Sequence, residues 1–92
     1  MLLYIVTYDI PSNRRRKKVS DILEGYGTRV QYSVFELVLV KSKYDELRKR
    51  LRRYVNFEED SIRFYPISQH TLEQVDIWGG LPLTKPQKSI VI

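Results

Sequence analysis

Residues 2–27, LLYIVTYDIPSNRRRKKVSDILEGYG, decide the fold. Leu2 to Tyr8 form an almost unbroken run of apolar, β-branched and aromatic residues, which predicts a central strand buried on both faces. Ser12 is placed to cap a following helix, because the apolar residues behind it recur at helical spacing: Val19, Ile22, Leu23 and Tyr26. Gly25 and Gly27 then predict where that helix ends.

Three further elements follow along the chain. Arg29 to Val40 contains neither Gly nor Pro, so it is either one long strand or two short strands that meet near Gln31 to Ser33. Ser42 and Asp45 resemble a capping box for a second helix, whose apolar face would consist of Tyr44, Leu47, Leu51, Tyr54 and Val55. Ile62 to Ile67 predicts a short strand near a sheet edge, because the segment contains a proline.

This order of elements predicts the fold class. It gives an α+β, ferredoxin-like βαββαβ arrangement in residues 1–78, an antiparallel sheet with two helices on one face. Leu72 to Trp78 alternates weakly and would add one more strand towards the C-terminus, and residues 79–92 form a tail. The first strand is apolar on both faces, whereas the helices suffice for only one. We therefore expect a homodimer in which the bare faces of two sheets meet.

The amino-acid composition limits the classes of function that the protein can have. The chain has 92 residues, and 16 Lys and Arg against 11 Asp and Glu give it a formal net charge of +5. It has no cysteine, which excludes thiol catalysis, a disulfide framework and zinc sites built on sulfur. No apolar run approaches the ~20 residues that span a bilayer, and the N-terminus is typical of a strand rather than a signal peptide. We expect a soluble cytoplasmic domain with a basic surface.

Five consecutive cations, Arg14 to Lys18, occupy the first turns of the predicted first helix. Positive charge is unfavourable at a helix N-terminus, so the run favours a bound anion such as phosphate; the alternative is a solvated basic face. The second helix adds seven cations: Lys41, Lys43, Arg48, Lys49, Arg50, Arg52 and Arg53. Two basic helices on one side of a small domain indicate binding to a nucleic acid backbone, through charge and shape.

Asp9 ends the apolar strand directly before the basic helix, and two interpretations stay open. An aspartate at such a position is commonly a turn or capping residue. Beside a phosphate site it would instead hold a magnesium or manganese ion, because hard cations prefer oxygen ligands. One carboxylate is too few for a metal site within a monomer, but a two-fold axis close to Asp9 would supply two.

Other residues carry weaker signals. Four could reach a nucleotide, although aromatic residues in strands are usually core: Tyr8, Tyr32, Ser33 and Phe35. His70 is the only histidine and has no acid or nucleophile at motif spacing, so we interpret it as a loop residue. The acidic segment 58–60 is interpreted as a solvated turn rather than a cation site.

Together these segments resemble a known family. Tyr8-Asp9-Ile10 closes the first strand and the cation run follows; then come Tyr26-Gly27, RVQYSVFE at residues 29–36 and DSIRFY at residues 60–65. The combination is similar to the second of the two core CRISPR adaptation proteins, the Cas-two family, from Met1 to about Ile77. Toxin-type proteins of the VapD kind share the architecture and stay an alternative.

The resemblance implies a homodimer that takes part in capturing spacer DNA and bridges integrase (Cas-one) subunits. It also implies metal-dependent nuclease activity on single-stranded RNA or duplex DNA, with Asp9 of each subunit as catalytic residue and magnesium (or manganese) ligand. Arg16 is the best single candidate for a phosphate contact. The residues expected at the nucleic acid are Tyr8, Ser12, Arg14, Arg15, Arg16, Lys17, Lys18, Arg29, Ser33 and Phe35.

Two points stay open from the sequence. The first is whether the protein is a magnesium-dependent endonuclease or a non-catalytic scaffold that presents nucleic acid to the integrase; no residue is identifiable as a general base. The second is whether the apolar Ile90-Val91-Ile92 adds a strand to a neighbouring subunit or is a frayed terminus.

Overall fold

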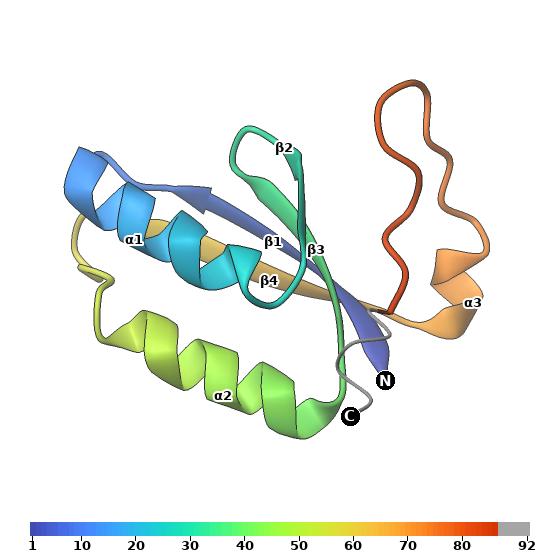
Figure 1. The fold of residues 1–92 in the computed structure, drawn as a ribbon, viewed down its shortest axis with the longest axis horizontal. Helices are drawn as coiled ribbons and strands as arrows, with labels where there is room; N and C mark the ends of the chain where they lie inside the picture. Colours follow the sequence, from blue (N-terminus) through green and yellow to red (C-terminus); the bar gives the residue numbers. More distant parts are fainter. Residues whose placement is uncertain (87–92) are drawn as a thin grey trace.

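The computed structural model, which describes residues 1–86, places two long helices over one face of a four-stranded antiparallel sheet (Figure 1). The elements in chain order are β1 (Leu2–Asp9), α1 (Asn13–Glu24), β2 (Thr28–Gln31), β3 (Val34–Leu39), α2 (Lys41–Arg52), β4 (Ser61–Ile67) and the short α3 (Gln69–Leu72). The sheet order is β2-β3-β1-β4. This is the predicted ferredoxin-like α+β arrangement, and β1 is its central strand.

The core lies between the sheet and the two helices. Val6 is opposite Phe35 of β3 and Phe64 of β4, and both Val6 and Phe35 are completely buried. The helices contribute Leu23 from α1 and Leu47 from α2, which are also completely buried. Two tyrosine rings, those of Tyr4 and Tyr44, stack with their centroids 3.8 Å apart and join β1 to α2.

The segment from Arg29 to Val40 forms two strands rather than one. β2 and β3 make a hairpin whose turn is Tyr32-Ser33, and the pairing register shifts between Arg29 and Gln31. No residue other than glycine has a positive φ in the described part of the chain, so this turn forms without the glycine that many tight hairpins require.

One of the two predicted helix starts is correct. Ser12 is the N-cap of α1, and its Oγ accepts a hydrogen bond from the backbone N–H of Arg15 at 3.2 Å. The capping box at Ser42 is wrong, because α2 already begins at Lys41 and its N-cap, Val40, makes no side-chain cap bond. Asp45 instead pairs with Lys41 on the same helix, at 3.1 Å.

The strand predicted at Leu72 to Trp78 is also wrong. Ser68 accepts a hydrogen bond from the backbone N–H of Thr71 and starts α3, and the chain from Glu73 to Pro86 has no regular structure. The cap at Ser68 thus favours a helical turn over the weak alternating pattern, and residues 73–78 do not join the sheet. The sheet of the described residues therefore lacks the additional C-terminal strand, and the strand expected at Ile90-Val91-Ile92 lies outside them.

The face of the sheet opposite the helices is only partly covered. Residues 81–86 lie against it, where Thr84 donates through its N–H and its hydroxyl to Oε1 of Glu36, at 3.1 and 2.9 Å. Ile5 and Thr7 of β1 stay partly exposed on this face, and Tyr65 of β4 is 43% exposed. The bare face that the sequence predicts is therefore present beside Asp9.

Candidate nucleic-acid interface and metal site

Asp9 and Tyr8, the last two residues of β1, point to opposite faces of the sheet, because successive side chains alternate along a strand. Tyr8 is buried with the core beneath the helices, whereas Asp9 is exposed at the end of the open face, opposite Ser61 of β4. Within residues 1–86 the Asp9 carboxylate makes no hydrogen bond or ion pair. It is therefore free to accept a ligand, and it is not a capping residue.

The turn from β1 to α1 is held by Arg16. Its guanidinium donates to the backbone carbonyl of Ile10 at 2.8 Å and to Oδ1 of Asn13. Both acceptors are uncharged, so the positive charge of Arg16 is not neutralised. This arrangement fixes one cation a few residues beyond Asp9 at the start of α1.

A small pocket of about 190 Å³ opens next to this turn. Its lining combines three cations with hydroxyl and amide groups: Tyr8, Asn13, Arg16, Lys17, Ser20, Arg29 and Tyr32. Burial raises the pKa of the Tyr8 hydroxyl, an effect that Arg29 and Arg16 partly oppose, so this phenol stays protonated near neutral pH. The pocket therefore offers positive charge and hydrogen-bond donors, which is the chemistry that a phosphate group requires.

The hairpin turn between β2 and β3 forms the other wall of this pocket. Nη1 of Arg29 donates to the carbonyl of Tyr32 at 3.0 Å, and the backbone N–H of Tyr8 donates to the carbonyl of Ser33 at 3.2 Å. The turn is thereby tied to the end of β1. Tyr32 itself is 78% exposed.

Phe35 does not belong to the interface. It is completely buried in the core, and the guanidinium of Arg29 lies over its ring, 5.2 Å from the centroid. A side chain without exposed surface cannot touch a nucleic acid, so the prediction for Phe35 is wrong. Sequence pattern alone could not separate it from Tyr32 and Ser33, which lie in the same short segment.

Arg15 is committed to an internal ion pair. Its Nε and Nη2 donate to both carboxylate oxygens of Asp60 at 2.9 Å, and Nη2 also reaches Glu59 at 3.0 Å. The Asp60 side chain has no exposed surface, so the prediction of a solvated acidic turn is wrong for this residue. Arg15 also lines the groove between α1 and the end of α2, but its guanidinium is occupied by these two carboxylates. The partners are 45 residues apart in sequence, which no local pattern reveals.

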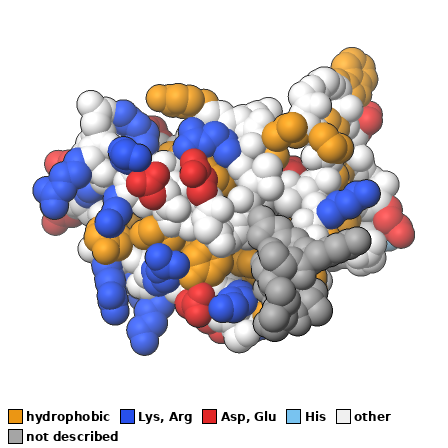
Figure 2. Space-filling view, viewed as in Figure 1, with side chains coloured by type: hydrophobic (Ala, Val, Ile, Leu, Met, Phe, Trp, Pro, Cys, Tyr) orange, Lys and Arg blue, Asp and Glu red, His pale blue; other side chains and the backbone are white. Residues whose placement is uncertain are grey.

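The remaining cations of the run line a broad groove of about 790 Å³ between α1 and the end of α2. Arg14, Lys17 and Lys18 contribute from α1, and Arg53 and Tyr54 from the segment after α2. Lys18 lies over the ring of Tyr54, 5.0 Å from its centroid. Lys and Arg side chains gather on the half of the molecule formed by α1 and α2 (Figure 2). The second helix contributes to this groove only through Arg53, since Arg48 and Arg52 line a different hollow and Arg50 donates to the hydroxyl of Tyr26, so the two helices share this surface only in part.

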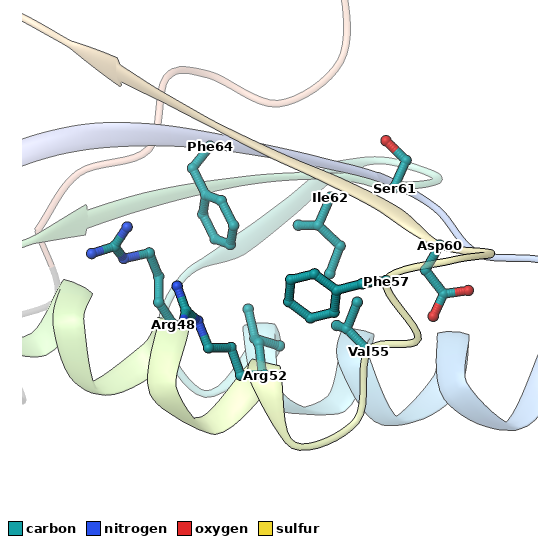
Figure 3. A pocket seen from close by; sticks show the side chains of 9 residues that line it. Arg48, Arg52, Val55, Phe57, Asp60, Ser61, Ile62 and Phe64 are labelled. Atoms are coloured by element: carbon teal, nitrogen blue, oxygen red, sulfur yellow. The ribbon is translucent and has the colours of Figure 1, made fainter.

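A third hollow, of about 450 Å³, lies between α2 and β4 and was not predicted (Figure 3). The apolar side chains of Phe57, Ile62 and Phe64 line this hollow, together with Arg48 and Arg52, which extend from α2. No cluster of three acidic, histidine or cysteine residues suited to a metal occurs among residues 1–86. Within these residues a metal site at Asp9 would therefore need ligands from outside the chain.

Comparison with known proteins shows the family of this chain. The model of the CRISPR-associated protein Cas2 family matches residues 1–75. This chain belongs to the Cas2 family. A Synechocystis relative named CRISPR-associated endoribonuclease Cas2 3 is 65% identical over 92 residues, with 100% of each chain covered. The family is therefore Cas2 and not the VapD-type alternative.

Solved structures agree with the Cas2 fold. A hypothetical protein from Thermus thermophilus superposes with a TM-score of 0.79 at 42% identity, covering 91% of this chain and 98% of that one. A chain of a partial Cas6-RT-Cas1–Cas2 complex gives a TM-score of 0.76 at 29% identity, with 100% of both chains covered. None of the helices in the described residues has the length and apolar character of a membrane span.

Proposed function

We propose that this Cas2 family member acts as a homodimer in CRISPR spacer acquisition, where it binds nucleic acid and bridges integrase (Cas1) subunits. We further propose that it is a magnesium- or manganese-dependent endonuclease that cuts single-stranded RNA or duplex DNA. The observation that carries the proposal is the free carboxylate of Asp9, exposed at the end of the bare sheet face and one residue before Ile10, whose carbonyl oxygen accepts a hydrogen bond from the guanidinium of Arg16.

The bare face supports the proposed homodimer. Ile5, Thr7 and Tyr65 expose apolar surface there, and a domain of this size gains much from burying it. A two-fold axis that crosses this face near the end of β1 brings two copies of Asp9 together. The dimer is therefore also what completes the candidate metal site.

Asp9 fits a hard divalent cation in its chemistry. The carboxylate is exposed and unpaired within the described residues, and magnesium prefers such oxygen ligands together with water. When bound, an ion of this kind stabilises the charge that develops on a phosphodiester during hydrolysis. The protein's own part is to hold the strand: Arg16, Lys17 and Arg29 bind phosphate oxygens, and the Tyr8 hydroxyl donates a hydrogen bond to one of them.

The test compares wild-type protein with Asp9→Asn, a variant that keeps the shape of the side chain and removes its charge. Labelled single-stranded RNA and duplex DNA are incubated with each protein, with magnesium or with chelator, and both cleavage and binding are measured. We expect cleavage to require magnesium and Asp9, while binding persists in the variant. Glu73→Gln serves as control, because this exposed acid follows α3 and forms no ion pair within residues 1–86. Full cleavage by Asp9→Asn would overturn the enzyme proposal.

A scaffold role without cleavage is the second candidate, favoured by the likeness to a chain of a complex that contains Cas1 and Cas2. In that case spacer insertion by the integrase depends on the cations of α1 and is unaffected in Asp9→Asn. Loss of insertion in Asp9→Asn together with loss of cleavage would reject the pure scaffold.

A further inference from the structure

We propose that Tyr32 is a stacking platform for an unpaired nucleobase, and that it makes this surface prefer single-stranded over duplex nucleic acid. The inference rests on the proposed function, since it names the substrate class of the same site. The sequence groups Tyr32 with Tyr8, Ser33 and Phe35, and in the structure Tyr32 has the most exposed side chain of the four.

The exposure of Tyr32 needs an explanation. Among the four candidates near the strand ends, Phe35 and Tyr8 are buried and Ser33 is partly buried, whereas the side chain of Tyr32 is 78% exposed. It projects from a two-residue hairpin turn and makes no side-chain hydrogen bond or aromatic contact within the described residues. A large aromatic ring left in water on a turn is available for contact with a ligand.

The backbone under Tyr32 is fixed on both sides. Arg29 donates to the carbonyl of Tyr32, and the backbone N–H of Tyr8 donates to the carbonyl of Ser33 next to it. The second of these bonds joins the turn to the strand that ends at Asp9. Both carbonyl groups of the turn are therefore hydrogen-bonded before a ligand arrives. This lowers the entropy cost of ordering the turn when a base binds.

The charge around the ring matches the backbone of a single strand. Tyr32 lines the same pocket as Arg16 and Lys17, so a base on the ring would have its phosphates beside these cations. A cationic surface with an aromatic ring is how proteins bind single strands, because every unpaired base offers a flat face. In a duplex those faces are covered by neighbouring base pairs, so only the attraction between the cations and the phosphates contributes to binding.

The test measures binding to the full chain by fluorescence anisotropy in the presence of chelator, with a labelled oligouridylate and a duplex DNA as probes. Tyr32→Ala should weaken single-strand binding by roughly 5- to 150-fold, the range that one stacked base supplies, and change duplex binding less than about twofold. Tyr32→Phe should retain wild-type affinity. Trp78→Ala is the control, since this ring is exposed but lies in the chain beyond α3.

Three results would overturn the inference. Equal affinity of Tyr32→Ala and wild type for oligouridylate would exclude stacking, as would equal weakening for both probes. Tyr32 would belong to a contact between copies of the chain if Tyr32→Ala altered the oligomeric state in gel filtration. Because the measurement needs no cleavage, a nuclease-inactive protein can still show the preference, and failure here leaves the Asp9 test unaffected.

Discussion

Arg15 and Asp60 form a bidentate ion pair that connects α1 to the loop before β4. Both Arg15–Asp60 bonds are 2.9 Å long, and Asp60 also accepts the backbone N–H of Asn56 at 2.9 Å. One carboxylate thus stabilises the loop between α2 and β4, through Asn56, and holds α1 against that loop, through Arg15. The cation run therefore contains two kinds of residue: one that builds the fold, and others that are available to a ligand.

Removing the carboxylate of Asp60 should destabilise the protein without touching the candidate site. Asp60→Asn keeps the shape but removes the charge from the buried bidentate partner of Arg15 and leaves only the exposed Glu59 as its ion-pair partner, so we expect the Tm to fall by roughly 5 °C or more. Thermal unfolding followed by circular dichroism measures this. Glu58→Gln is the matched control, because this carboxylate forms no ion pair in residues 1–86. An unchanged Tm in Asp60→Asn would show that the pair does not contribute.

The same pair predicts how stability depends on pH. The hydrogen bonds from Arg15 lower the pKa of Asp60 below its ordinary value. Since the folded-state pKa lies below the unfolded-state value of about 3.9, the stabilisation is complete above pH ~4 and is lost as the pH falls through the folded pKa. The Tm should stay level from pH 5 to 8 and drop in more acidic buffer. Asp60→Asn should show a shallower acid drop, and an equally steep one would contradict this assignment.

Gly27 should not tolerate a side chain. A Cβ there would overlap the carbonyl oxygen of Glu36 and the side chain of Leu37, because the chain after α1 passes closely over β3. We expect Gly27→Ala to lower the Tm by roughly 10 °C or to prevent folding. At Gly25 a Cβ would lie 3.3 Å from its nearest neighbour, the carbonyl oxygen of Ile22, so Gly25→Ala should cost much less. Similar melting of the two variants would refute the close approach.

The groove between the helices predicts a salt-dependent contribution to binding. Reversing the charge of Arg14 or Lys18 should weaken binding of every sequence alike. Each lost phosphate contact should reduce the slope of log K against log salt by ~0.7 for single strands and ~0.9 for duplex. Affinity measured over a salt series tests this. Lys85→Glu is the control outside the groove, and an unchanged slope in the α1 variants would place the nucleic acid elsewhere.

The sequence predicted the fold well because its strongest signals are local. The apolar run of β1, the Ser12 cap and the spacing of Val19 and Leu23 each act over a few residues, and all of them are present in the structure. The failures needed tertiary information. Nothing near Asp60 in sequence indicates Arg15 as its partner.

The candidate site was predicted only in part, for the same reason. The alternation along β1 indicates that Tyr8 and Asp9 lie on different faces, but the pattern of β3 does not reveal that Phe35 is buried while Tyr32 is exposed. That difference arises from the hairpin turn, which places Tyr32 outside the strand pair. Packing between distant elements therefore decides which of several neighbouring candidates can meet a ligand.

The proposal that two Asp9 carboxylates share one metal ion is tested most directly by the stoichiometry of metal binding. Manganese titrated into the protein and followed by electron paramagnetic resonance counts the bound ions per chain. If two Asp9 carboxylates share one ion across the two-fold axis, wild type binds one ion for every two chains and Asp9→Asn binds none. One ion per chain, or binding that is unchanged in Asp9→Asn, would contradict the shared site.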